Sequence, residues 1–455
     1  MSWTSDHEYR AFSTAAPRRD LSLAPAGQWS LDIWDVTDEN PEGRWHVETS
    51  PDCLRDKAQL RIVFAPFKTP RQSSSAQILE LFRILRIPRD VLRPACHNFG
   101  SRLDAHGHCS WFQHLFKNIH VRQDPGKLPE VDNRAASPGH PLSTLPQADY
   151  SWIKSCFFLR RYEDGSTILV CFAAPPQVAR RIDLFTDTGS WGDVQANPYV
   201  LFDMVLEGLF LQVDEMVWNM AAVCGPLEHS ILELAHTQDF AKLNSQLSFA
   251  ALHNCAKHII HLTEGLEGCV MVVDAVLLNC DGASGDLGRQ DSFPLTDVNS
   301  RVHVQQQLRE CLRHRRFLFR STQLRLSSLQ KRTDNTITLA FNVVTQKDSM
   351  EMTRDSRVMK TIAAITIVFL PTTGVASVVG SQLLTSNWHD DSKTWTIMAT
   401  PLFWLTWWIA IPLTVCVVVL ALTWQWWVNA DRPQVRGRLL LQRPVEWANL
   451  LRQRK

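Results

Sequence analysis

The sequence predicts an α+β soluble N-terminal region, followed by a long helical stalk and two transmembrane helices. Three observations indicate this order. The chain of 455 residues has a formal charge of only +1, yet eight of its 17 tryptophans lie within residues 388–427. Two stretches near the same end, 361–389 and 394–430, contain no charged residue, and residues 295–370 contain neither Gly nor Pro. The modest overall hydropathy excludes a carrier with many spans.

The N-terminal part shows weak periodicity. Residues 1–28 are rich in Ser, Ala and Pro and are expected to form a disordered tail. Residues 29–198 are expected to form a mixed α/β cytoplasmic domain with a Pro-rich loop at 124–149, which holds five prolines. Two apolar runs, Trp152 to Leu159 and Ser166 to Ala174, flank the turn signal Glu163-Asp164-Gly165 and are predicted to be adjacent strands of one sheet.

Charge is separated into blocks along the next part of the chain. Residues 182–241 carry ten carboxylates and no Lys or Arg, within an acidic helical region predicted for 199–294. The predicted stalk helix, 295–360, carries nine basic residues and one acidic residue between Arg301 and Thr333. The two blocks are expected to pair, either within one chain or between neighbouring chains. The alternative is that both are solvated faces, because single surface ion pairs contribute little.

One apolar stripe is expected on the first acidic helix, which the pattern predicts from Tyr199 to Val223. Its members are Leu206, Leu209, Phe210, Val213, Val217 and Met220. Nucleic-acid binding by the basic stalk is discounted, because most of the stalk lacks interleaved aromatic residues.

Two membrane spans are predicted at 361–380 and 404–428, joined by a loop at 381–403. A helix from Trp407 to Trp424 would rise about 26 Å, so its tryptophans would form two belts roughly one hydrocarbon thickness apart. The alternative is a buried helical hairpin of a soluble core. Eight basic residues flank the spans on their outer sides, partly in the basic tail 429–455, against one in the loop. This excess places both termini on the cytoplasmic or matrix side.

One face of the first span mixes hydroxyl and apolar side chains at helical spacing. Its members, the candidate pore-lining residues, are Met359, Ile362, Thr366, Leu370, Thr373 and Ser377. Two helices cannot enclose an aqueous path, so a path along this face requires several copies of the chain. The alternative is that the hydroxyls bond to their own helix or pack between helices.

The C-terminal pattern resembles a known family. The long helix, Met359-Lys360, Phe369-Leu370-Pro371, the short loop and a Trp-rich second span with Ile411-Pro412-Leu413 are similar to the CorA superfamily of divalent cation channels, most of all to its divergent fungal branch. Upstream, Phe341-Asn342 and Gln346-Lys347-Asp348-Ser349 also resemble that branch. The resemblance covers about 199–431.

The resemblance implies a homopentamer in a lipid membrane, with an α/β/α soluble domain, divalent cations of a magnesium-like kind as substrate and no cofactor. The family's Gly-Met-Asn signature, which meets the hydrated ion, here reads Gly380-Ser381-Gln382. Gln382 keeps an amide oxygen, so a ring of acceptors is still possible, but the signature is degenerate and selectivity or transport itself could be altered. Asp390 and Asp391 in the loop would attract cations. Carboxylates between Asp183 and Asp239 are candidates, by region alone, for a gating metal site.

Other residue clusters have ordinary interpretations. Cys96-His97 and His106-x-His108-Cys109 contain zinc-binding atoms but lack zinc-site spacing. His258 and His261 share a helix face and could sense metal or protons, although a polar face is the simpler interpretation. The eleven cysteines contain no CxxC pair and are expected to be reduced thiols. No enzyme motif is found. The competing hypothesis, favoured by the large unmatched N-terminal region and the altered signature, is a non-conducting, membrane-anchored interaction or regulatory protein on the same scaffold.

Overall fold

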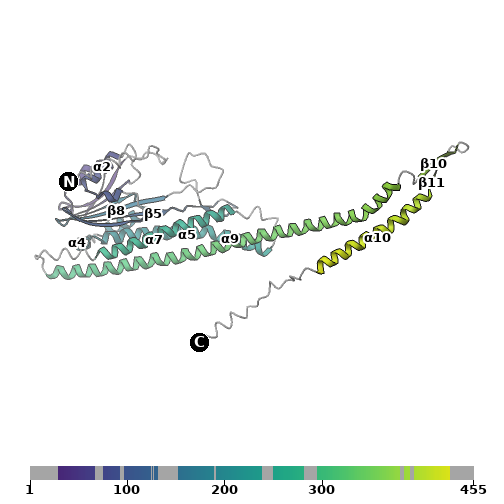
Figure 1. Ribbon diagram of the computed structural model, residues 1–455. Helices are drawn as coiled ribbons and strands as arrows, with labels where there is room; N and C mark the ends of the chain where they lie inside the picture. Colours follow the sequence, from purple (N-terminus) through teal and green to yellow (C-terminus); the bar gives the residue numbers. More distant parts are fainter. Residues whose placement is uncertain are drawn as a thin grey trace, which may run out of the picture. The chain divides into compact units, whose positions relative to one another are not determined.

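The computed structural model forms two compact units, Met1–Val344 and Thr345–Lys455 (Figure 1). The described residues are 29–66, 75–92, 97–123, 125–126, 128–131, 152–188, 191–237, 249–280, 295–379, 384–389 and 394–430. The predicted tail 1–28 and most of the Pro-rich loop 124–149 lie outside them, as does nearly all of the basic tail 429–455.

A seven-stranded mixed sheet is the centre of the first unit. Its order is β2 (Arg44–Glu48), β1 (Leu31–Val36), β3 (Leu60–Ala65), β9 (Thr167–Phe172), β8 (Trp152–Tyr162), β5 (Gly107–Lys117) and β4 (Phe99–Asp104). Only the β3 and β9 pair is parallel among these neighbours. The predicted strands β8 and β9 are adjacent and antiparallel, with Phe157 opposite Cys171, which confirms the prediction made from the turn between them. A separate small sheet pairs β6 (Val121–Arg122) with β7 (Glu130–Val131).

Alternating residues of the strands form two separate cores, one on each face of the sheet. Ile62 and Leu169 belong to one core, and their neighbours Val63 and Val170 belong to the other. The second core is covered by α2 (Ser75–Ile84), with the short helices η1 (Pro51–Arg55) and η2 (Arg89–Leu92) nearby in sequence. The first core is covered by α3 (Pro176–Asp187), α4 (Gly192–Ala196), α5 (Val200–Thr237) and α7 (Phe249–Cys280). The period of two along each strand therefore produces the expected α/β/α layers.

Two glycines let α5 and α7 approach their neighbours closely. A side chain at Gly208 of α5 would meet the backbone of Val178 on α3 at 2.5 Å, and one at Gly265 of α7 would meet the Phe116 ring on β5 at 2.5 Å. The predicted apolar stripe of α5 faces the core: Leu206, Leu209, Val213, Val217 and Met220 are buried and Phe210 is partly buried. The helix continues past the predicted end, Val223, because Pro226 is accommodated inside it.

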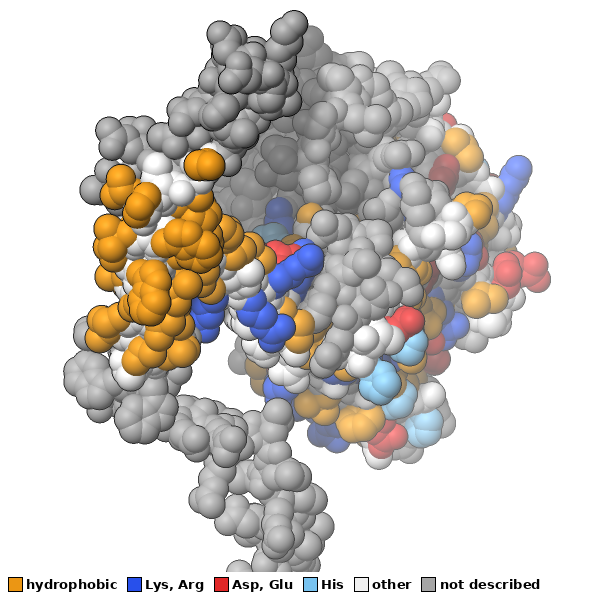
Figure 2. Space-filling view, turned by 90° about the vertical axis from the view of Figure 1, so that its right-hand side faces the viewer, with side chains coloured by type: hydrophobic (Ala, Val, Ile, Leu, Met, Phe, Trp, Pro, Cys, Tyr) orange, Lys and Arg blue, Asp and Glu red, His pale blue; other side chains and the backbone are white. Residues whose placement is uncertain are grey.

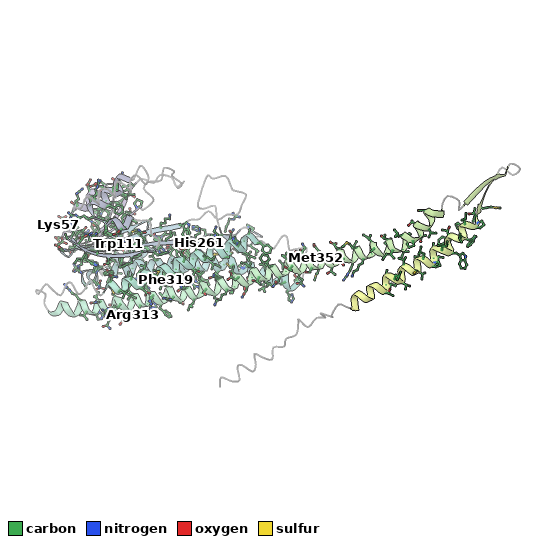
Figure 3. The ribbon with its side chains drawn as sticks, viewed as in Figure 1. Lys57, Trp111, His261, Arg313, Phe319 and Met352 are labelled. Atoms are coloured by element: carbon green, nitrogen blue, oxygen red, sulfur yellow. The ribbon has the colours of Figure 1, made fainter. Side chains whose placement is uncertain are left out.

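The stalk is the longest element, α9 (Leu295–Val379), and it includes the predicted first span without a break. In the first unit its apolar residues, among them Leu312, Phe319 and Leu326, join the core formed with α5 and α7. The Phe319 ring, labelled in Figure 3, meets the Phe210 ring edge to face at 5.5 Å. Apolar packing therefore holds this part of α9 against α5 and α7.

The second unit contains the end of α9, a hairpin and α10 (Pro401–Ala430) (Figure 1). The hairpin, β10 (Leu384–His389) with β11 (Thr394–Ala399), sets Trp388 opposite Trp395 and was not predicted within the loop 381–403. Both α9 and α10 contain a stretch long and apolar enough to cross a membrane, and only 6% of each stretch is buried. Figure 2 shows hydrophobic side chains gathered in a dense patch on one face of the molecule. Apolar helices this exposed do not behave as the core of a soluble protein, which supports a membrane protein.

Candidate functional site

The six candidate pore-lining residues share one exposed side of α9. At 3.6 residues per turn, Met359 to Ser377 at these spacings fall within an arc of about 80°. Met359, Ile362 and Leu370 are 68%, 58% and 68% exposed. The opposite side is less exposed: Pro371 is buried, and Ile367 and Val375 are half-buried. Most of the first span is exposed, Val368 and Phe369 included, so the role of this face in lining a pore stays a prediction.

The three hydroxyls of this face bond to their own helix. Thr366 donates to the carbonyl oxygen of Ile362 at 2.9 Å, Thr373 to Phe369 at 2.6 Å, and Ser377 to Thr373 at 2.8 Å. Such bonding of the hydroxyls to their own helix is the arrangement that the sequence pattern left open as the alternative to a pore lining. It uses the single hydroxyl proton and leaves oxygen lone pairs that can accept hydrogen bonds from water. The face is therefore a row of acceptors among apolar side chains.

The remaining predicted entrance residues lie outside the described part of the chain. These are Gly380, Ser381 and Gln382, together with Asp390 and Asp391. Their roles stay predictions.

The acidic and basic blocks of the first unit pair with each other within one chain. Pairing within the chain was one of the two arrangements expected, the other being pairing between neighbouring chains. Arg315 of α9 lies 3.4 Å from Asp203 and 2.7 Å from Glu207, both on α5. Glu207 also accepts from Arg181 of α3 at 2.6 Å. Two guanidinium groups thus neutralise two carboxylates. Burial raises the pKa of Asp203, and the charge of Arg315 opposes that rise.

Further contacts repeat along α9. Asp214 of α5 accepts from Thr322 at 3.1 Å and from Arg325, and the Arg325 guanidinium lies 4.5 Å from the centre of the Trp218 ring. Farther along, Arg332 binds Glu228, with its Nε atom 3.1 Å from a carboxylate oxygen. On α7, Asp274 binds Arg316 at 2.5 Å.

These pairings bear on the predicted gating metal site. Asp203, Glu207, Asp214 and Glu228 fall in the candidate region and are each bound by arginine. Among the described residues, no group of three or more His, Cys, Asp and Glu is placed to hold a metal ion.

Two of the histidines suggested for zinc, His97 and His108, contact other side chains. The rings of His97 and His114 stand edge to face at 5.9 Å, and His108 exchanges a hydrogen bond with Ser101 at 2.9 Å. Cys96 is outside the described residues. The suggested zinc cluster does not assemble from the residues that are described.

The shared face of His258 and His261 is not a polar surface, because His258 is only 1% exposed. Burial lowers the pKa of His258 to about 4, with Lys117, His261 and Lys257 adding repulsion. His261 stacks edge to face on Trp152 at 5.2 Å. Burial likewise lowers the pKa of Lys117 to about 7. The sequence pattern located the pair but did not predict its burial against β5 and β8.

Comparison with known proteins gives limited likenesses. No family model matches the chain. The chain is 25% identical over 282 residues to Notoamide biosynthesis cluster protein M' of Aspergillus versicolor, and the match spans 58% of each protein.

Solved structures with a related chain path include three proteins. The ZntB cytoplasmic domain from Vibrio parahaemolyticus covers 72% of this chain and all of its own, at 11% identity and a TM-score of 0.32. The soluble domain of CorA from Methanocaldococcus jannaschii covers 69% of this chain and 97% of its own, at 8% identity and a TM-score of 0.39. Full-length CmaX covers 90% of this chain and 98% of its own, at 14% identity and a TM-score of 0.40. All three TM-scores are below 0.5, a degree of likeness that decides neither fold nor function.

Proposed function

We propose that this chain is one subunit of a homopentameric membrane channel for divalent cations, of the CorA-like class, with magnesium-like ions as substrate. The observation that carries the proposal is the exposed face of α9 from Met359 to Ser377, which combines apolar side chains with hydroxyl acceptors. The sequence resemblance to CorA-like channels over residues 199–431 supports the same assignment.

Magnesium determines what such a face must do. The ion holds its water ligands tightly, so a pore can pass it with its hydration shell retained. The hydrogens of those waters point outward and need acceptors. The lone pairs of Thr366, Thr373 and Ser377 meet that need, while the apolar residues between them bind too weakly to hold the ion.

Several copies are required because two helices cannot surround water. With five copies, each hydroxyl position would become a ring around the pore axis. Gln382 would add a ring of amide oxygens at the entrance, and Asp390 and Asp391 would raise the local cation concentration there.

Influx into liposomes tests the proposal. The full chain is reconstituted, and entry of Mg²⁺ and of Zn²⁺ is followed with entrapped dyes, while native mass spectrometry counts the copies. Influx above that of empty liposomes is expected, from an assembly of five. If a five-copy assembly admits neither ion, the transport proposal fails.

The competing function is a membrane-anchored regulatory protein that does not conduct. Two observations favour it: Gly380-Ser381-Gln382 replaces the family signature, and arginines occupy the carboxylates that could have bound a gating metal. A pentamer without influx would support this second function.

A further inference from the structure

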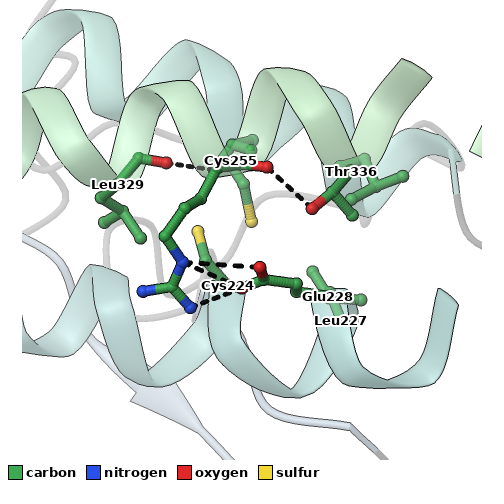
Figure 4. A pocket seen from close by; sticks show the side chains of 9 residues that line it. Cys224, Leu227, Glu228, Cys255, Leu329 and Thr336 are labelled. Atoms are coloured by element: carbon green, nitrogen blue, oxygen red, sulfur yellow. Dashed lines mark hydrogen bonds and ion pairs between the residues drawn. The ribbon is translucent and has the colours of Figure 1, made fainter. Parts of the chain in front are cut away.

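A small hollow in the first unit is lined by α5, α7 and α9 (Figure 4). Two cysteines, Cys224 of α5 and Cys255 of α7, form part of its wall, together with Arg332 and Thr333 of α9. Nothing in the proposed transport function uses these thiols.

The two thiols face one another across the helix interface. Both side chains line the hollow, and Figure 4 shows the two sulfur atoms turned toward each other. Cys224 is 6% exposed and Cys255 is 2% exposed.

The surroundings make the two thiols unequal. The contacts with Cys255 and Thr333 and the positive charge of Arg332 lower the pKa of Cys224, and burial opposes them. Arg332 lines the hollow and interacts with Cys224 through its charge. Because a neighbouring positive charge favours the thiolate, which is the reactive form, we assign Cys224 as the nucleophile and Cys255 as its resolving partner.

We propose that Cys224 and Cys255 are a redox modification site that forms a reversible intrachain disulfide on reaction with a hydroperoxide. The Cys224 thiolate attacks the peroxide oxygen and the O–O bond breaks. The leaving hydroxide or alkoxide takes up the proton that Cys224 released, so the products are a sulfenic acid and water or an alcohol. The Cys255 sulfur then attacks Sγ of Cys224, its proton leaves with the hydroxyl group as water, and the S–S bond forms. The two thiols lose two electrons, which the peroxide accepts, and a cellular dithiol reverses the reaction.

Oxidation would also change the part of α5 and α7 that contacts α9. The Cys224 thiol beside Arg332 is lost, and α5 and α7 become covalently joined beside the Arg332–Glu228 ion pair. This site does not depend on cation transport, so it stands or falls separately from the proposed channel.

A matched pair of buried thiols is available as a control. Cys156 of β8 and Cys171 of β9 lie on adjacent strands, but Cys156 belongs to one core and Cys171 to the other. Side chains on opposite faces of a sheet cannot be bridged by a disulfide.

Mass spectrometry of the full chain in detergent tests the proposal directly. The protein is treated with hydrogen peroxide, remaining thiols are alkylated, and the chain is digested without reduction. Because residues 182–241 contain no Lys or Arg, a Glu-specific protease is used, which separates residues 216–228 from 234–264. A linked peptide joining these two segments is expected, which disappears after reduction, with no link between Cys156 and Cys171. If the folded chain gives no such peptide, or links Cys156 to Cys171 as readily, the proposal is overturned.

Two variants test the assigned roles, with tryptophan fluorescence confirming that each is folded. Cys255→Ser should accumulate sulfenic acid on Cys224, trapped by a dimedone reagent, because the resolving thiol is absent. Cys224→Ser should give no adduct on Cys255. Equal adducts in both variants would contradict the division of roles.

Discussion

The guanidinium group of Arg315 lies 3.4 Å from a carboxylate oxygen of Asp203, whose side chain is only 3% exposed. The buried charge on α5 therefore has its compensation on α9, 112 residues away in the sequence. Removing one partner of a buried pair leaves the other charge uncompensated, which is far more costly than losing a surface pair.

Arg315→Gln should accordingly destabilise the first unit by about 3 kcal/mol. Thermal unfolding of the full chain in detergent, followed by fluorescence, measures the effect. Arg313, which is exposed and labelled in Figure 3, provides the matched control on the same helix. Arg313→Gln should change stability by no more than about 0.5 kcal/mol. Equal losses in both variants would show that general charge, and not this pair, is responsible.

Thr366→Val should reduce cation influx several-fold, because it removes an acceptor from the proposed pore face and keeps the side-chain shape. Thr361 is the control: its hydroxyl bonds to Arg357 at 2.9 Å just as that of Thr366 bonds to Ile362. It lies about 140° around the helix from Thr366. Thr361→Val should leave influx unchanged. If both variants conduct like the original chain, the face is not the pore lining.

Gln382→Ala should change the ratio of Mg²⁺ to Zn²⁺ influx if the amide oxygen meets the hydrated ion. Gln382→Asn, which restores the residue type of the family signature, should retain transport and shift the ratio toward magnesium. An unchanged ratio in both variants would remove Gln382 from the entrance site.

The hairpin between the spans should face away from the cytoplasm or matrix, as the flanking basic residues predict. A cysteine introduced by Ser392→Cys should react with an impermeant maleimide in intact, right-side-out vesicles, whose non-cytoplasmic face is exposed to the reagent. One introduced by Gln434→Cys, beyond the second span, should react only after the membrane is opened. The reverse pattern would invert the topology.

Stability should fall as the pH is lowered from 10.5 to 7 because of Lys117. Burial lowers its pKa from 10.5 to about 7, with Lys257 adding repulsion, while its Nζ lies 5.1 Å from the Trp152 ring centre. In this window the unfolded chain binds the proton and the folded chain does not, so acidification favours unfolding. Lys117→Met should flatten the dependence, as measured by Tm in steps across the window. A parallel curve for the variant would assign the slope to other groups.

Local patterns predicted local structure well. The spacing of apolar residues from Leu206 to Met220 identified the buried face of α5, and the turn at Glu163 to Gly165 identified the strand pair β8 and β9. The helix end at Val223 was placed too early, because the core contacts of Leu227 and Ile231 hold the helix together beyond Pro226.

Long-range partners could be predicted only as blocks. Charge separation indicated that the acidic and basic segments meet, but it contained no information that Arg325 binds Asp214 or that Cys224 faces Cys255. Those contacts depend on how three helices lie against the sheet. The hairpin of β10 and β11 was missed since its strands are short, and nothing in the pattern of a six-residue segment distinguishes it from a connecting loop.

The order of the ion pairs along α9 determines how this helix can move. Arg315, Arg325 and Arg332 meet Asp203, Asp214 and Glu228 in ascending order on both helices, so α5 and α9 run parallel. Sliding α9 by one turn would separate all three pairs at once and leave a buried carboxylate without its cation. The ion pairs therefore oppose axial translation of α9 against α5, and the buried pair of Arg315 with Asp203 contributes most of that resistance.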